Sequence, residues 1–231
     1  MKKVIIALLL LFISVNLFAQ DEAEEQKKKF SFSGSVDAYY KTNISGPNTA
    51  YDDGDGTYFL TPGTSFANRS GFSLGMANLI ASYEGEKVGF VADLVFGPRG
   101  EDAVFLSVGS SNIVNQLYVY WNVSEKVKLT FGNFNTFLGY EVISPVANFN
   151  YSTSYMFSYG PFSHTGLKAD FQLSDDFSLM LAVMNSTDYT ELNLDGSYTL
   201  GAQLGYSGQF LNFIYGNQTG ATDATFQVDY T

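Results

Sequence analysis

Residues 30–41 read FSFSGSVDAYYK, a stretch in which apolar and polar side chains alternate. Successive side chains of a β-strand point to opposite faces, so one face carries Phe30, Phe32, Val36, Ala38 and Tyr40. The opposite face carries the serines together with Asp37, Tyr39 and Lys41. This period of two predicts a strand with one apolar surface and one polar surface.

The same alternation returns along the rest of the chain. It is clear in residues 165–173, 199–207 and 224–231. Less regular alternation predicts six more strands, at about 71–83, 88–96, 113–123, 127–137, 177–186 and 210–218. The sequence therefore predicts about ten strands.

The lengths of these strands and of their connections indicate a membrane protein. Most are close to the 9 to 11 residues of a tilted strand that crosses a bilayer. Tight turns at 84–87, 124–126, 174–176 and 208–209 alternate with long loops at 42–70, 97–112, 138–163 and 187–198, and the link 219–223 departs from this by being short. Proline, which cannot donate to a β-ladder, occurs only in the long loops, as Pro47, Pro62, Pro98, Pro145 and Pro161.

These features predict an all-β fold, an antiparallel up-and-down transmembrane β-barrel with short turns on the periplasmic side and long loops outside. Beyond the N-terminus, no stretch of the sequence approaches the run of about 18 apolar residues that a transmembrane helix needs. The alternative is a soluble β-sandwich or secreted adhesin, in which the apolar faces would pack against each other.

The N-terminus has the pattern of an export signal. A cationic start at Lys2 and Lys3 is followed by an apolar run and then by Ala19, after which we expect cleavage. The predicted organisation is a signal peptide at 1–19, a charged segment at 20–29 and an outer-membrane β-barrel at 30–231. The alternative for residues 1–19 is a membrane-anchoring helix.

The composition excludes several classes of function. The chain has no cysteine, one histidine and a formal net charge of −11, so we expect no nucleic acid partner. Carboxylates alternate in the stretch 52–57, as in a calcium loop, but Tyr58 and Thr64 stand where an EF-hand requires Gly and Glu. We therefore expect no metal and no cofactor.

A hundred-residue stretch resembles a known family. In order, it contains VFGPRG at 95–100, QLYV at 116–119, LTFGNF at 129–134, FLGYE at 137–141 and SYGPFSHTG at 158–166. These strings resemble the β-barrel porin-2, OmpL-like, family of outer-membrane proteins. The resemblance implies a barrel, and by fold-level analogy a porin.

The resemblance also bears on the C-terminus. Chains of the family usually continue further, and a complete barrel tends to end on an aromatic residue, whereas Thr231 follows Tyr230 here. We therefore expect the barrel to be C-terminally incomplete. The alternative is a small closed barrel of ten strands.

The predicted function is porin-like, namely passive diffusion of small hydrophilic solutes or ions across the outer membrane. Polar residues of the inward faces are then the candidate pore lining: Asp37, Lys41, Asp93, Lys128, Lys168, Asp170, Gln172, Gln203 and Asp229. The candidates for the loop mouth or constriction are Arg99, Glu101, Glu141, Tyr155 and Tyr159. Because loop 138–163 is aromatic-rich and long, we expect it to fold inward and narrow the channel.

The expected partners are outer-membrane lipid, lipopolysaccharide and small hydrophilic solutes; the sequence predicts no oligomeric state. Acidic loops predict a weak cation preference at the mouth. We expect no enzyme, because Ser163 and His164 are adjacent on a strand and point to opposite faces, with His164 at the outer rim. The alternative function is a non-conducting structural or surface-binding barrel that acts through its extracellular loops.

Overall fold

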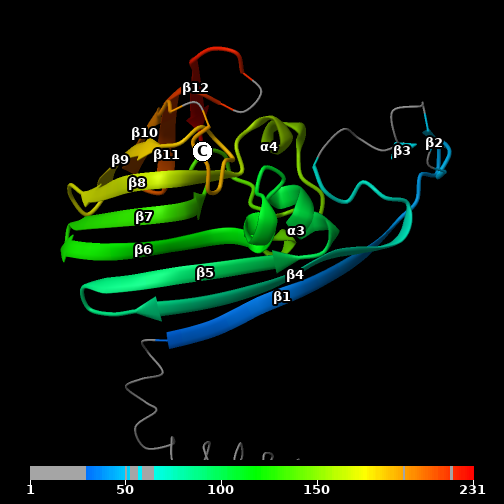
Figure 1. Cartoon of the computed structure of the whole chain (residues 1–231), viewed down its shortest axis with the longest axis horizontal. Helices are drawn as coiled ribbons and strands as arrows, with labels where there is room; N and C mark the ends of the chain where they lie inside the picture. The colour runs from blue at the N-terminus through cyan, green and yellow to red at the C-terminus, as the bar shows by residue number, and fades with distance from the viewer. Residues whose placement is uncertain (1–29, 50, 53–56, 59–64, 195, 219–220) are drawn as a thin grey trace, which may run out of the picture.

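The computed structural model describes residues 30–49, 51–52, 57–58, 65–194, 196–218 and 221–231. The expected signal peptide and the charged segment 20–29 lie outside these residues, as does most of the acidic stretch 52–57. Figure 1 shows one large, strongly curved sheet with short helices at one end of its strands.

Ten strands form a single antiparallel sheet in which every strand pairs with its neighbours along the chain, in the order β1-β4-β5-β6-β7-β8-β9-β10-β11-β12. Their bounds are β1 Phe30–Lys41, β4 Gly71–Glu84, β5 Val88–Phe96, β6 Val114–Ser124, β7 Val127–Asn135, β8 Ser163–Gln172, β9 Phe177–Met184, β10 Thr199–Tyr206, β11 Gln209–Gly216 and β12 Thr225–Tyr230. The predicted ten-strand antiparallel organisation is confirmed, with strand ends that differ by at most two residues.

The long loops contain structure that the alternating pattern does not predict. A short hairpin, β2 Tyr51–Asp52 with β3 Thr57–Tyr58, lies in the first loop. The later loops contain α3 (Pro98–Ala103), the 3-10 helices η1 (Gly109–Ile113) and η2 (Pro145–Ala147), and α4 (Tyr155–Tyr159). Pro98 and Pro145 begin helices here, where a missing N–H leaves no hydrogen bond unmade.

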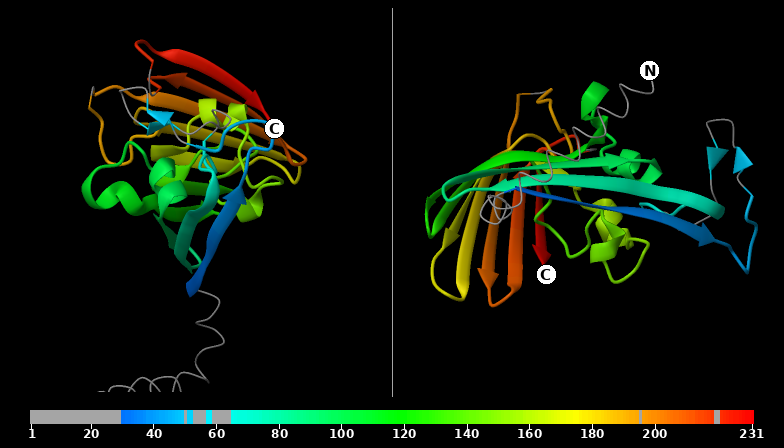
Figure 2. Two further views of the ribbon diagram at one scale, coloured as in Figure 1. Left: turned by 90° about the vertical axis from the view of Figure 1, so that its right-hand side faces the viewer. Right: turned by 90° about the horizontal axis from the view of Figure 1, so that it is seen from below.

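The two faces of the sheet differ as the alternation predicts. Large apolar side chains of the convex face are exposed, for example Phe72 at 92% and Val36 at 81%. Within the described part of the chain, no second sheet covers this face (Figure 2). The sandwich alternative is therefore wrong, because the apolar side chains are not packed between two layers.

The concave face is filled at the loop end of the strands by two apolar clusters. One cluster joins α3 and the β4–β5 strands through Phe66, Met76, Val95, Ala103, Val104, Ile143 and Phe162. The other lines β7 to β11 through Phe134, Leu138, Met180, Ala182, Met184 and Ile214. Both clusters include residues of the segment between β7 and β8, so this segment belongs to the interior of the fold.

Two strand glycines allow close approach of their neighbours. A Cβ at Gly89 would come within 2.3 Å of the Tyr120 ring, and one at Gly132 would come within 2.3 Å of the Leu117 carbonyl oxygen on the paired strand. Gly132 also has φ 133°, which other residues rarely adopt. Aromatic rings over strand glycines cover backbone that has no side chain of its own.

The sheet is not closed, because β1 and β12 form its two edges and each pairs with one neighbour. Among the described residues, no helix is long and apolar enough to cross a membrane. The free edges carry backbone N–H and C=O groups that need partners in an apolar surrounding.

The apolar convex face leads to a first prediction. Leu181 lies mid-strand on β9, between Ala169 and Ala202, and is 47% exposed. Leu181→Arg should lower the free energy of unfolding from phospholipid vesicles by about 2–4 kcal/mol, because it places a charge in hydrocarbon. Denaturant titration in vesicles measures this. Leu181→Val is the control, and equal stability of the two variants would contradict a lipid-facing position.

Candidate functional site: the concave face of the sheet

Residues 136–162 between β7 and β8, here called the inner loop, cross the concave face of the sheet. The loop contains η2 and α4, and the right-hand view of Figure 2 shows α4 on the concave side of the curved sheet. It hydrogen-bonds to Asp37 on β1 and to Asp229 on β12, the two edge strands. The expected inward folding of this loop is therefore seen in the structure.

Both ends of the inner loop are fixed at one point. The Thr136 N–H donates to the Phe162 carbonyl at 3.0 Å, and the Thr136 hydroxyl lies 2.9 Å from Nε2 of His164. Asp188, from the β9–β10 loop, accepts hydrogen bonds from the N–H groups of Phe162 (2.6 Å) and Ser163 (3.1 Å). Burial raises the pKa of Asp188 to about 6.

His164 is completely buried between the rings of Phe134 and Phe137. The expectation of a polar residue at the outer rim is therefore corrected: His164 is at the loop end of β8 but faces the filled interior. The register places it opposite Phe134, and Ser163 opposite Asn135, and both side chains are buried. Within the described residues, the hydroxyl hydrogen-bonded to His164 is that of Thr136, whose side chain closes the loop.

Arg99 of α3 joins the inner loop to β1. Its guanidinium donates to the carbonyls of Ile143 (3.2 Å) and Tyr151 (2.8 Å) and lies over the Phe66 and Tyr151 rings. Nε lies 3.9 Å from the Asp37 carboxylate, which accepts hydrogen bonds from the Tyr151 hydroxyl and the Met76 N–H. Burial and then the bond to Asp37 raise the pKa of Tyr151 to about 12, so the phenol stays a donor.

A chain of polar side chains joins the inner loop to the opposite edge. Gln203 on β10 donates to Asn212 on β11 at 2.7 Å, and Asn212 donates to Asp229 on β12 at 2.8 Å. Gln203 also donates to the Phe137 carbonyl, and Asp229 accepts the Gly139 N–H at 2.9 Å. The loop is thus also held at both edges of the sheet, at β1 through Tyr151 and at β12 through Gly139.

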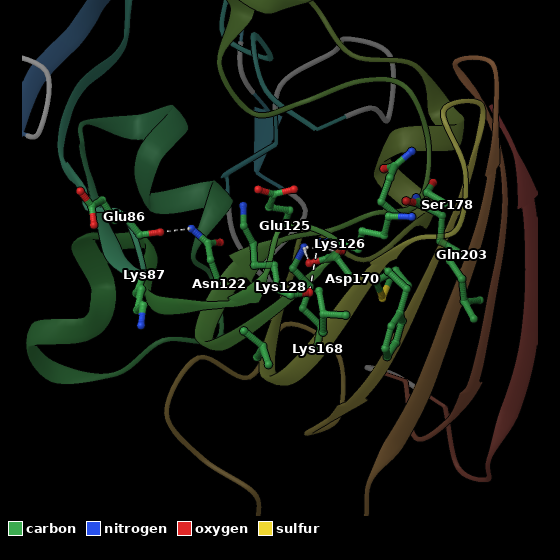
Figure 3. A pocket seen from close by; sticks show the side chains of 17 residues that line it. Glu86, Lys87, Asn122, Glu125, Lys126, Lys128, Lys168, Asp170, Ser178 and Gln203 are labelled. Atoms are coloured by element: carbon green, nitrogen blue, oxygen red, sulfur yellow. Dashed lines mark hydrogen bonds and ion pairs between the residues drawn. The ribbon is translucent and has the colours of Figure 1, made fainter.

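The turn end of the concave face contains a hollow of about 800 Å³, here called the turn-side hollow. Figure 3 shows its lining side chains, which come from β6 to β10 and from the turns after β4 and β6. Lys168 and Asp170 form an ion pair at 3.4 Å on its wall. The ammonium of Lys128 lies 4.8 Å from the centre of the Tyr120 ring.

The structure places the nine candidate pore-lining residues in several environments. Five line the turn-side hollow: Lys128, Lys168, Asp170, Gln172 and Gln203. Asp37 and Asp229 hold the inner loop, Lys41 donates to the Ala67 carbonyl at the loop end of β1, and Asp93 is buried.

The candidate mouth residues are similarly divided. Arg99 is 2% exposed and is a structural connection within the interior. Glu141 accepts a hydrogen bond from the N–H of Ser154, which lies in the same inner loop. The side chains of Tyr155 and Tyr159 on α4 are exposed, at 57% and 85%. Glu101 is exposed on α3.

Sequence reasoning missed the amide cluster around Asp93. Asn78, Asn115 and Gln116 all donate to its carboxylate, the last two at 2.7 and 3.0 Å. The register shifts between Asp93 and Leu94, and this bulge lets two consecutive residues of β6 face the same side. A strict period of two could not have indicated it.

In the part of the chain that the structure describes, no group of three or more His, Asp or Glu side chains could hold a metal ion. Comparison with protein families matches residues 29–231 to the family described as "Putative beta-barrel porin-2, OmpL-like". The chain belongs to this family. The expected resemblance is thereby confirmed over nearly the whole chain outside the N-terminus. No curated protein and no solved structure matches it.

The Arg99 contacts of this porin-2 family member give a second prediction. Arg99→Gln should lower the free energy of unfolding by about 3–5 kcal/mol, because it leaves the Asp37 carboxylate buried without its cation. The double variant Arg99→Gln with Asp37→Asn should recover part of that loss. Denaturant unfolding of both single variants and the double variant measures the coupling, and strictly additive losses would contradict an interaction between the two groups.

The position of Asp188 gives a third prediction. Its pKa is about 6 in the folded protein, above the unfolded value near 3.9, so folding favours the protonated form. Stability from this group is present at low pH and lost as pH rises through about 4 to 6. Asp188→Asn, which keeps an acceptor without the charge, should therefore gain stability relative to wild type across that range. Thermal unfolding from pH 4 to 8 tests this, and a pH-independent difference would contradict it.

Proposed function

We propose that the protein is a porin-type channel that lets small hydrophilic solutes or ions diffuse passively across the outer membrane. The observation that carries this proposal is the turn-side hollow of about 800 Å³, which charged and amide side chains line. It lies on the concave face of a sheet whose convex face is apolar and exposed. Membership of a porin family supports the same function.

The convex face supports lipid as the surrounding medium. Its exposed side chains are leucines, valines and phenylalanines on the strands, with Trp121, Tyr206, Tyr215 and Tyr230 near strand ends. Aromatic residues of this kind favour the interface between hydrocarbon and water. We infer contact with outer-membrane lipid and, around the long loops, with lipopolysaccharide, after export through the N-terminal segment.

The polar lining supports a passive mechanism without chemistry. Hydrated solutes need only an aqueous path whose side chains replace part of the water shell, and charged side chains bias which ions enter. The buried His164 side chain hydrogen-bonds to Thr136 and contacts the rings of Phe134 and Phe137. These contacts favour a structural role for His164. The inner loop would set the narrowest point, because it spans the concave face from β1 to β12.

A second function is favoured by the packing at the loop end. There the two apolar clusters and the inner loop fill the concave face, as side chains fill small barrels of about eight strands. A barrel that stays filled in this way would not conduct. It would act as a structural or surface-binding protein through its outer loops.

Single-channel recording in planar bilayers distinguishes the two functions and gives a fourth prediction. We expect discrete conductance steps from the refolded protein. Deletion of residues 142–157, bridged by Gly-Ser, should raise the step size several-fold, because it removes the part of the inner loop that crosses the concave face.

The control is a deletion of residues 44–47 in the first loop, where the neighbouring Asn43 and Asn48 bond to each other. This variant should conduct like wild type. Electrical silence of both the wild type and the inner-loop deletion would overturn the channel and favour the non-conducting barrel.

A further inference from the structure

The lysines of this acidic protein are concentrated at one place. The described residues contain five lysines, namely Lys41, Lys87, Lys126, Lys128 and Lys168. All except Lys41 line the turn-side hollow. Three carboxylates line it as well, those of Glu86, Glu125 and Asp170, so four positive charges face three negative ones in a chain of net charge −11.

The charges at the rim of the hollow balance, and those on its wall do not. Glu86, Lys87, Glu125 and Lys126 belong to the turns after β4 and β6 and contribute no net charge. On the wall, Lys168 is paired with Asp170 at 3.4 Å. Among the described residues, Lys128 has no carboxylate within ion-pair distance, and it remains the uncompensated charge of the wall.

Two aromatic rings hold the wall lysines in place. The Lys128 ammonium lies over the Tyr120 ring at 4.8 Å, and that of Lys168 lies over the Phe134 ring at 5.4 Å. The two residues come from the adjacent strands β7 and β8, with Asp170 directly opposite Lys128. Cation–π contact positions an ammonium without neutralising it, so the Lys128 charge stays available to a ligand in the hollow, and the Lys168 charge is reduced only by Asp170.

The charged residues at the loop end of the molecule are mostly acidic. The described carboxylates in the loops after β5, β7, β9 and β11 are Glu101, Asp102, Glu141, Asp188, Glu191 and Asp223, and these loops contain no lysine. The expected weak cation preference depended on such loop residues. The charges of the turn-side hollow favour anions instead, and a concave wall of low dielectric focuses their electric field.

We propose that the turn-side hollow binds small anions, inorganic or carboxylate-bearing, with Lys128 and Lys168 as the anion contacts and Asp170 as the group that limits their attraction. This inference rests on the proposed channel function and adds a charge preference to it. Anions would be concentrated at the periplasmic end of the path, before they reach the inner loop.

The test is the reversal potential of the full chain in planar bilayers under a potassium chloride gradient. Lys128→Gln should shift the chloride-to-potassium permeability ratio toward potassium by roughly two- to fivefold, the scale of one unit charge at close range in water. Asp170→Asn should shift it toward chloride by a similar factor. Because screening shortens the reach of a charge, both shifts should shrink at 1 M salt.

The opposite signs of the two substitutions separate an electrostatic site from general damage to the fold, which would move both variants alike. Ser110→Glu on η1, which is exposed and lies at the opposite end of β6 from the hollow, changes net charge as Lys128→Gln does and should have the smaller effect. Wild-type current with no shift in either wall variant would overturn the anion site and leave the channel standing. Absence of current in the wild type would instead overturn the channel on which the site rests.

Discussion

The structure depends on one constraint: a strand in hydrocarbon must pair its whole backbone and present an apolar face outward. The period-two alternation supplies the apolar face for ten strands at once, because it sends phenylalanine, leucine and valine to the convex face, while the free edges of β1 and β12 still need partners. The alternation also leaves the concave face to polar residues, small residues and residues that pack against the inner loop. The hollow, the amide cluster around Asp93 and the contacts of the inner loop all occupy the face that this constraint leaves free.

The two ends of the concave face satisfy their polar groups differently. At the loop end, buried side chains bond to one another and to backbone, as Arg99 does with Ile143 and Tyr151. At the turn end, the charged side chains of Lys128 and Lys168 line an open hollow, where aromatic rings and Asp170 are their partners. A filled half at the loop end and a hollowed half at the turn end therefore share one sheet, and the inner loop is the boundary between them.

The strands could be predicted from the sequence because alternation is a local property, set by residues two apart. The predicted ends of β5 at 88 and 96 agree with the structure for that reason. The site was predicted less completely, because its key contacts join residues far apart in the chain. Tyr151 and Asp37 are 114 positions apart, and no local pattern indicates that Arg99, expected at the mouth, is buried between them. The complete burial of His164 likewise follows from where Phe134 and Phe137 pack.

The inner loop has a consequence for the order in which the protein assembles. Strands that pair in the large sheet follow one another in the chain order of that sheet, so the sheet can grow one strand at a time, and loop closure costs rise only slowly with loop length. The bonds from Tyr151 to Asp37 and from Gly139 to Asp229 span 114 and 90 positions; the second cannot form until β12 exists. A partly grown sheet would therefore have an unanchored inner loop on its β12 side, and its interior would still be accessible to water. Sheets before and after the addition of β12 should therefore differ in permeability as well as in shape.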